Sequence, residues 1–141
     1  LSRGLGDVYK RQPLLDRIDL HLEVPRLTYE KLTDKQKMET SIDIRKRVEI
    51  GRETQRRRFA NFPFNLNSEM GPRQLEKFCL LDPPSQELLR QAVNQLQLSG
   101  RAYHRILKLA RTIADLAQSE DIQTAQVAEA LQYRPKEQII F

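Results

Sequence analysis

Apolar and polar residues alternate strictly in only one part of the chain, the run Ile-Asp-Leu-His-Leu-Glu-Val at residues 18–24. Its apolar members Ile18, Leu20, Leu22 and Val24 would share one face of an extended segment, which predicts a β-strand with one buried side. A single strand cannot satisfy its own backbone hydrogen bonds, so its sheet is expected outside this sequence. The pattern therefore indicates a piece of a larger protein.

From residue 41 onward the apolar spacing is that of helices. A long helix is predicted from about Ser41 to Ala60, with many arginines beside a narrow apolar stripe. The polar residues 26–40 before it are interpreted as a linker, and residues 61–71, which contain Asn, Pro and Gly, as a loop. The stripe consists of Ile42, Ile44 and Val48.

Three later helix starts carry a recognisable signal. Pro72 stands at the first position of a short helix, where a missing backbone N–H costs nothing. Asp82 is a favoured N-cap in front of Pro83. Ser99, or Gly100 beside it, caps the next helix. Each signal predicts a boundary within a residue or two.

The last helix is predicted near residues 124–133, and Pro135 ends it. Apolar residues recur at helical spacing in the last three helices, so these helices can share one core. The fold class is therefore mainly α: an orphan strand, a linker, and a small helical bundle over residues 41–135, followed by a tail at 136–141. The repeating apolar residues are Leu88, Leu89, Ala92, Val93, Leu96, Ala102, Ile106, Leu109, Ala110, Ile113, Ala114, Leu116, Val127, Ala128 and Leu131.

No apolar period runs through residues 1–12, and they meet the rest of the chain abruptly at Pro13. They resemble a translated adapter sequence, so we expect them to be foreign to the protein. A natural flexible terminus is the alternative. Under either interpretation they carry no part of the function.

Composition is that of a globular protein, with 39% hydrophobic and 30% charged residues. Aromatic residues make up only 6%, so the core must rest on aliphatic side chains, which favours helices packed on helices. The single cysteine, Cys79, excludes an internal disulfide and indicates a reducing cytoplasm. No apolar run approaches the roughly 20 residues that span a bilayer, so no membrane contact is expected.

No motif in the chain supplies catalysis by itself. The sequence lacks GxxxxGK[ST], the loop that cradles phosphates with its backbone amides. No metal site is expected, because His21 and His104 lie in different elements and no His/Cys cluster has ligand spacing. Cys79 follows Phe78 on an apolar helix face, which predicts a buried structural thiol. A self-contained enzyme is therefore not predicted.

Two stretches resemble a known family. The run Pro-Leu-Leu-Asp-Arg-Ile-Asp-Leu at residues 13–20 resembles the L-L-x-R-[FI]-D segment of the AAA+ branch that holds magnesium chelatase ATPase subunits and MCM helicases. Residues 99–116 resemble the lid helix of the same branch. With the basic helix and the ending Ala-Glu-Ala-Leu-Gln-Tyr-Arg, the resemblance covers residues 13–134. The chain is identified as similar to the C-terminal part of the magnesium chelatase-like ComM/YifB family.

The resemblance implies roles for several arginines. Arg17 would be an arginine finger directed at the γ-phosphate of a neighbouring subunit, an effect worth roughly 10³–10⁵ in rate in related NTPases. Arg101 would be the sensor-two residue at the start of the lid helix, where the helix dipole also attracts phosphate. Arg105 lies one turn further on and would assist it. Lys108 and Arg111 are expected to face solvent or a neighbouring subunit.

Each role has a simpler alternative. Arg17 would otherwise form a structural salt bridge with Asp16 or Asp19, and Arg101 would be an exposed helix arginine. For the basic helix, the resemblance to a ring ATPase suggests that Arg45, Arg52 and Arg56 contact DNA phosphates, which would make binding sensitive to salt. The alternative for these arginines is that they form surface ion pairs. The alternative interpretation of the net charge of +5 is a basic face that contacts only solvent. The acidic partners available are Asp43, Glu49 and Glu53.

The intact family is a ring-forming ATPase, expected as a hexamer, and its ComM members act as DNA branch-migration helicases in natural transformation. The resemblance places residues 13–25 at the end of the ATPase core and residues 41–135 in its helical lid. The Walker A and B motifs would lie outside this chain, so ATP and Mg²⁺ belong to the assembled protein and the chain alone should not hydrolyse ATP. Two alternatives stay open: a standalone basic module that binds nucleic acid or protein, and a subunit of a true magnesium chelatase.

Overall fold

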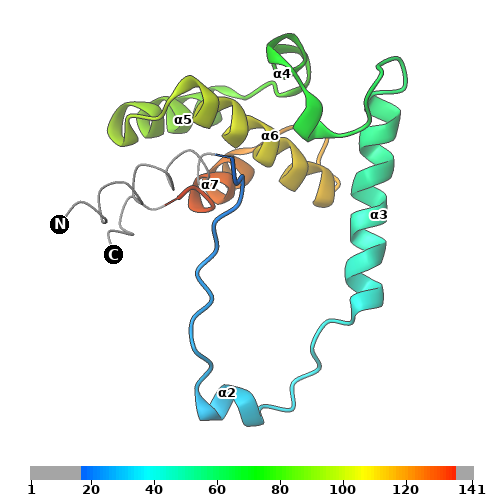
Figure 1. Cartoon of the computed structure of the whole chain (residues 1–141), viewed down its shortest axis with the longest axis vertical. Helices are drawn as coiled ribbons and strands as arrows, with labels where there is room; N and C mark the ends of the chain where they lie inside the picture. The colour runs from blue at the N-terminus through cyan, green and yellow to red at the C-terminus, as the bar shows by residue number, and fades with distance from the viewer. Residues whose placement is uncertain (1–16, 136–141) are drawn as a thin grey trace, which may run out of the picture.

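The computed structural model describes residues 17–135 of the 141-residue chain. Within this range the chain is mainly helical, as predicted, and strand-like pairing is limited to one isolated bridge between Leu81 and Ile122 (Figure 1). The expectations for residues 1–12 and 136–141 lie outside the described residues. The elements are α2 (Tyr29–Thr33), α3 (Ser41–Arg58), the 3₁₀ turn η1 (Asn67–Glu69), α4 (Pro72–Phe78), α5 (Pro83–Leu96), α6 (Gly100–Leu116) and α7 (Thr124–Gln132).

Side-chain caps fix the starts of the longer helices. The carboxylate of Asp82 accepts a hydrogen bond at 2.9 Å from an amide in the first turn of α5. Ser99 caps α6 in the same way at 3.1 Å, and Thr40 caps α3 at 3.2 Å. Each bond satisfies an amide that the first helical turn leaves unpaired. The predicted caps Asp82 and Ser99 are confirmed.

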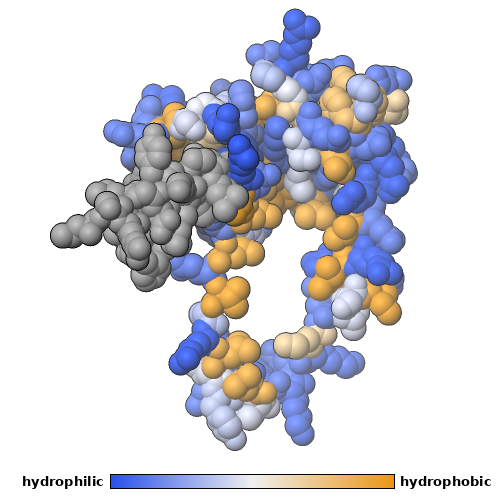
Figure 2. Space-filling view, in the orientation of Figure 1, coloured by the Kyte–Doolittle hydropathy of each residue, from blue (hydrophilic) through white to orange (hydrophobic). Residues whose placement is uncertain are grey.

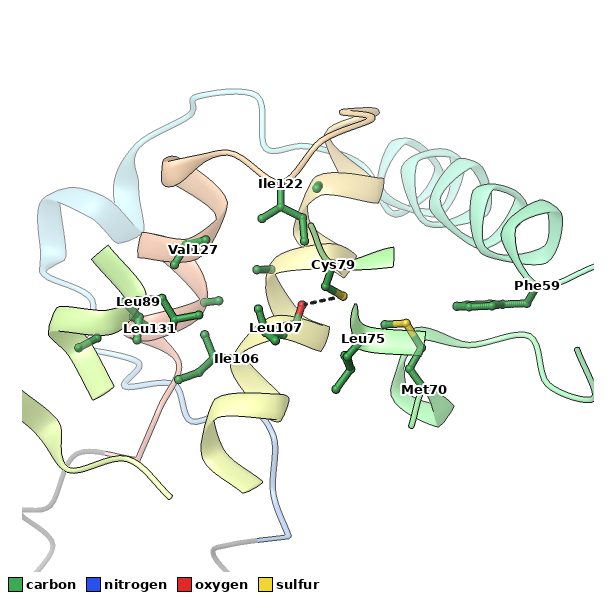
Figure 3. Packing of buried hydrophobic residues seen from close by; sticks show 14 residues of the cluster. Phe59, Met70, Leu75, Cys79, Leu89, Ile106, Leu107, Ile122, Val127 and Leu131 are labelled. Carbon is green, nitrogen blue, oxygen red and sulfur yellow. Dashed lines mark hydrogen bonds between the residues drawn. The ribbon is translucent and has the colours of Figure 1, made fainter. Parts of the chain in front are cut away.

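The central helix is α6, which contacts α3, α4, α7 and η1. Its apolar stripe meets those of α5 and α7, and Leu89, Ile106 and Val127 are almost fully buried between them (Figure 3). Cys79 is buried beside α6, where its thiol lies 3.8 Å from the carbonyl oxygen of Leu107. The predicted buried thiol is confirmed, and the same burial raises its pKa to about 11.

Aromatic rings close the end of the bundle where α3 meets α4. Phe59, directly after α3, is fully buried, and its ring centroid lies 5.0 Å from that of Phe64 and 5.5 Å from that of Phe78. Phe62 joins the same cluster, 6.0 Å from Phe59 in an edge-to-face arrangement. Four of the few aromatic residues are therefore concentrated where they anchor the loop between α3 and α4.

The alternating segment 18–24 does not form a strand in this structure. It has no ladder with any described segment, and the backbone bond recorded for it joins the amide of His21 to the carbonyl of Tyr133 at 2.9 Å. Its apolar side chains are exposed, up to 90% for Val24. A strand needs a neighbour to pair its backbone and a layer to cover its apolar face, and residues 17–135 supply neither.

Residues 17–50 form a wide arc outside the bundle (Figure 1). The segment predicted as a linker contains α2, which buries no residue, and α3 ends at Arg58 rather than Ala60. The predicted stripe of Ile42, Ile44 and Val48 is exposed, because nothing packs on that half of α3. None of the helices described between residues 17 and 135 is long and apolar enough to cross a membrane.

Candidate functional site

A cationic hollow of about 600 Å³ lies where residues 17–19 and η1 approach the first half of α6. Arginines, a lysine and a histidine dominate its wall, and Asp19 is its carboxylate. The lining residues are Arg17, Asp19, Ser68, Gly100, Arg101, His104, Arg105, Lys108, Leu109 and Thr112.

The basic residues of α6 reach the hollow because of their spacing. Arg101, Arg105 and Lys108 follow one another by four and three residues, so they lie on one face of the helix. Arg101 stands in the first turn, directly after the Ser99 cap. Unpaired amides and the positive end of the helix dipole add to the attraction for anions at this end. The structure thus brings the predicted Arg101 and Arg105 together.

Arg17 joins them from a segment more than eighty positions earlier in the chain. Next to it, the carboxylate of Asp19 pairs with the guanidinium of Arg105 at 3.2 Å. Asp19 was a suggested salt-bridge partner for Arg17. Within the described residues, Asp19 instead forms its ion pair with Arg105. The other suggested partner, Asp16, lies outside that range. The pair ties the segment at 17–21 to α6 and draws Arg105 toward the Asp19 side.

Lys108 differs from the expectation that it faces solvent or a neighbouring subunit. Its ammonium group donates a hydrogen bond to the backbone carbonyl of Ser68 in η1 at 2.9 Å, and the side chain lines the hollow. The reason is local: η1 lies against α6 and presents an unpaired carbonyl within reach of Lys108. Lys108 therefore adds to the cationic wall.

The expectation that Arg111 faces outward is wrong, because its side chain is only 5% exposed. It donates to the carboxylate of Asp115 at 3.1 Å and to the backbone carbonyls of Ser119 and Glu120 at 2.7 and 2.8 Å. Burial lowers the pKa of Arg111, and the neighbouring Asp115 opposes that change. Each of the three nitrogens of Arg111 thus has a partner, and two of these bonds hold the loop after α6.

Asp115 is the centre of a buried polar cluster that the sequence did not predict. Its side chain is fully buried, and the carboxylate accepts hydrogen bonds from Arg58, Arg111 and Asn67. Arg58 also donates to the side-chain oxygen of Asn67 at 2.9 Å. The spacing of Arg111 and Asp115 by four residues was a usable signal in the sequence. The approach of Arg58 to Asp115 gave no signal in the sequence, because the two residues are 57 positions apart.

The predicted DNA-contacting arginines lie on α3, away from the hollow. Arg45, Arg52 and Arg56 are all exposed and are spaced to share one side of the helix. Arg56 pairs with Glu53 at 3.2 Å, as the ion-pair alternative suggested. Neither Arg45 nor Arg52 has a hydrogen-bonded or ion-paired partner among residues 17–135. Their charge is available to an external anion.

The donor set of the hollow fits phosphate oxygens rather than a metal ion. Guanidinium and ammonium groups donate hydrogen bonds and neutralise negative charge, and arginine matches phosphate in a two-pronged geometry. A Mg²⁺ site requires several carboxylate or carbonyl oxygens, and within residues 17–135 no group of three or more acidic, histidine or cysteine side chains is placed to hold a metal. The hollow therefore offers hydrogen-bond donors and positive charge for an anion, and Asp19 is the single carboxylate in its lining.

These features define a class of protein: a helical lid domain whose central helix lines a cationic hollow with arginines and a lysine. Residues 38–134 match the family described as magnesium chelatase, subunit ChlI C-terminal. This match covers more than half of the chain, and the chain belongs to that magnesium chelatase-like AAA+ family as its C-terminal part.

Curated relatives narrow the family to the ComM/YifB type. The chain is 43% identical over 123 residues to competence protein ComM of Haemophilus influenzae, which covers 86% of this chain and 23% of the relative. It is 36% identical over 129 residues to YifB of Salmonella typhimurium, covering 91% of this chain and 25% of the relative. YifB of Escherichia coli is 35% identical over 130 residues, with 91% and 25% covered. The chain thus spans about a quarter of the length of these relatives.

Proposed function

We propose that this chain is the C-terminal part of a ring-forming ATPase and that its cationic hollow binds the triphosphate of ATP held mainly by another part of the protein. The convergence of Arg17, Arg101, Arg105 and Lys108 on one hollow, with Asp19 as its carboxylate, is the observation that carries the proposal. Because the 141 residues contain no P-loop, the ATP and its Mg²⁺ must be held principally elsewhere.

Arg17 is proposed as the arginine finger. Its guanidinium would neutralise charge that develops on the transferred phosphoryl group, and a finger contributes roughly 10³–10⁵ in rate, or about 4–7 kcal/mol of barrier. Arg101 is proposed as the sensor-two residue, reinforced by the dipole of α6. Since both line the same hollow, we infer that they contact the same triphosphate, which a neighbouring copy in a ring would present.

Kinetics of a full-length protein containing this segment test the proposal. Arg17→Ala should lower kcat by about 10³-fold or more while leaving nucleotide affinity nearly unchanged. Arg101→Ala should weaken both nucleotide binding and its coupling to hydrolysis. The matched control is Arg90→Ala, an exposed arginine of α5 that pairs with Glu87. Unchanged turnover in Arg17→Ala would show that Arg17 is not an arginine finger. Normal kinetics in Arg101→Ala would show that Arg101 is an exposed helix arginine without a role at the ATP site.

The work done by ATP is proposed to be DNA branch migration in the cytoplasm during natural transformation. Support comes from the similarity to competence protein ComM and from the unpaired charges of Arg45 and Arg52 on exposed α3. A hexameric ring would place one α3 from each copy near the DNA. Contacts of this kind bind phosphates without regard to sequence. A magnesium chelatase subunit is the alternative, favoured by the description of the matching family.

Salt dependence of DNA binding separates these possibilities. In the full-length protein, Arg45→Ala with Arg52→Ala should reduce the slope of log affinity against log salt by roughly two, one for each lost phosphate contact. Arg73→Ala with Arg90→Ala removes the same charge from exposed positions on α4 and α5 and should leave the slope nearly unchanged. Equal effects of the two pairs, or an absence of DNA binding, would contradict the DNA role of α3.

A further inference from the structure

α3 is held to the bundle by only one of its halves. Every residue from 41 to 50 is exposed, and buried positions begin at Gly51 and continue with Gln55 and the following Phe59. In Figure 1 the helix runs away from the bundle, beyond the end of α6. The exposed half, which we name the α3 arm (residues 41–50), therefore takes its direction from the half that follows it.

The first point of attachment is a close approach at Gly51. A Cβ atom built on this glycine would lie 3.0 Å from Cδ2 of Leu116 and 3.6 Å from its Cγ. The last residue of α6 therefore packs directly on the backbone of α3, and a larger side chain at position 51 would have to displace Leu116. By contrast, a Cβ at Gly100 would meet nothing within 4 Å.

The second point is the ion pair between Arg58 and Asp115. The two terminal nitrogens of Arg58, Nη1 and Nη2, donate to the two carboxylate oxygens of Asp115, the Nη1 bond at 2.7 Å, so the pair is two-pronged and oriented. Asn67 and Arg111 fix the same carboxylate from η1 and α6 at 2.8 and 3.1 Å. The Arg58 side chain is 13% exposed and that of Asp115 is 0% exposed, so solvent screens the pair little.

These two points are seven residues apart, which corresponds to about 10 Å along a helix. A helix attached at one point can swivel, whereas attachment at two points on one side sets its direction. The chain before α3 cannot supply that constraint, since all residues from 22 to 40 are exposed.

We infer that Gly51–Leu116 and Arg58–Asp115 form a two-point joint that sets the direction of α3 relative to α6. Asp115 is then a positioning residue: it holds the α3 arm, with Arg45, at a fixed distance from the cationic hollow at the other end of α6. Any tilt of α6 is transmitted to the α3 arm as a rigid movement. The inference rests on the geometry of this chain and stands whether or not the hollow binds ATP.

Distance measurement between spin labels tests the joint in the 141-residue chain. Lys46→Cys places one label on the α3 arm and Gln95→Cys places the other on α5, both at exposed positions. The native Cys79 is buried and its pKa is raised to about 11, so it escapes labelling at neutral pH. The two-point joint predicts a single narrow distance distribution.

Variants at each point should loosen or redirect the arm. Arg58→Gln removes the ion pair but leaves Arg111 on Asp115, and we expect the width of the distribution to roughly double because one attachment is lost. Gly51→Leu leaves the ion pair intact and should shift the mean distance by a few ångströms, on the order of the size of the added side chain. Helical circular dichroism confirms that each variant is folded.

Matched controls are Arg90→Gln on α5 and Gly100→Leu, a glycine with open space around it. Both should leave the distribution as it is in the parent. A broad distribution in the parent would overturn the inference, as would an unchanged distribution in both Arg58→Gln and Gly51→Leu. If Arg58→Gln fails to fold, Gly51→Leu decides, since a folded variant with an unmoved arm contradicts the joint.

Discussion

Phe59 is fully buried, whereas Val24 is 90% exposed, and the two represent two regions of one chain. From residue 59 onward the apolar stripes of α4, α5, α6 and α7 face one another and close a core (Figure 3). Residues 17–50 contain comparable apolar side chains, yet these line both sides of an opening and remain uncovered (Figure 2). The apolar pattern is equally clear in both regions. Only the apolar side chains after residue 59 are covered by other parts of the described chain.

An apolar stripe contributes to stability only where a second surface covers it. The bundle should therefore unfold as one cooperative unit, while residues 17–50 contribute little to the free energy of unfolding. Both proposed functional surfaces depend on this division. The hollow joins the outer segment at Arg17 to the bundle at α6, and the α3 arm extends from the bundle into the outer region.

The largest expected effect is at Asp115. Asp115→Asn leaves Arg58 and Arg111 without a counter-charge, and loss of one partner of a buried ion pair costs about 3–5 kcal/mol. Urea unfolding followed by circular dichroism measures the change. Asp121→Asn, at an exposed carboxylate in the loop after α6, should change stability by less than about 0.5 kcal/mol. Equal effects at the two positions would mean that the buried cluster does not stabilise the bundle.

Paired leucine truncations compare the two regions directly. Leu89 is 2% exposed in the core, so Leu89→Ala should lower the free energy of unfolding by about 2–5 kcal/mol. Leu22 is 69% exposed, so Leu22→Ala should change it by less than about 0.5 kcal/mol. The same urea titration measures both. A large loss in Leu22→Ala would show that the outer segment is packed in solution.

Cap removal makes the same comparison with a smaller effect. Ser99→Ala removes the cap of central α6 and should cost about 1 kcal/mol in the unfolding of the bundle. Thr40→Ala removes the cap of the exposed end of α3, where fraying does not disturb the core, so the midpoint of unfolding should hardly move. Helical circular dichroism should still register a small loss in Thr40→Ala. If Thr40→Ala shifts the midpoint of unfolding as much as Ser99→Ala does, the α3 arm unfolds together with the core.

The smallest effect is a pH dependence at the start of α5. Hydrogen bonds from Ser85 lower the pKa of Asp82 below its ordinary value of 3.8. A lowered folded-state pKa stabilises the fold above the unfolded-state pKa, and the contribution is lost as pH falls through the folded-state pKa. Asp82→Asn keeps a capping oxygen without a titrating charge, so its melting temperature should fall less steeply below about pH 4. Parallel curves for the two proteins would contradict this assignment.

Local signals in the sequence predicted most of the bundle. Asp82 and Ser99 indicate where their helices begin, because a cap bond forms between residues three apart. The spacing of Arg101 and Arg105 indicates that both lie on the face of α6 that lines the hollow. Contacts between residues far apart in the chain had no comparable signal in the sequence. The approach of Arg58 to Asp115 and of Lys108 to Ser68 depends on how helices dock. The strand expected at 18–24 required a sheet that residues 17–135 do not contain.

The candidate site divides in the same way. Family resemblance singled out both Arg101 and Arg17. The place of Arg101 after a cap gave it local support, whereas no local signal indicated that Arg17 lies near it, since the two residues are far apart in sequence. Arg111 was misassigned because a helix position alone does not reveal whether a neighbour covers it. Its buried environment became clear only with the folded loop at Ser119 and Glu120.

The central claim is that Arg17 acts on ATP held by another copy of the protein. The most direct measurement mixes two full-length variants, Arg17→Ala and a second in which the P-loop lysine is replaced, each with little ATPase activity of its own. An equimolar mixture should regain hydrolysis, because an intact P-loop in one copy then meets an intact Arg17 in its neighbour. A mixture as inactive as its two components would show that Arg17 does not act on ATP held by another copy.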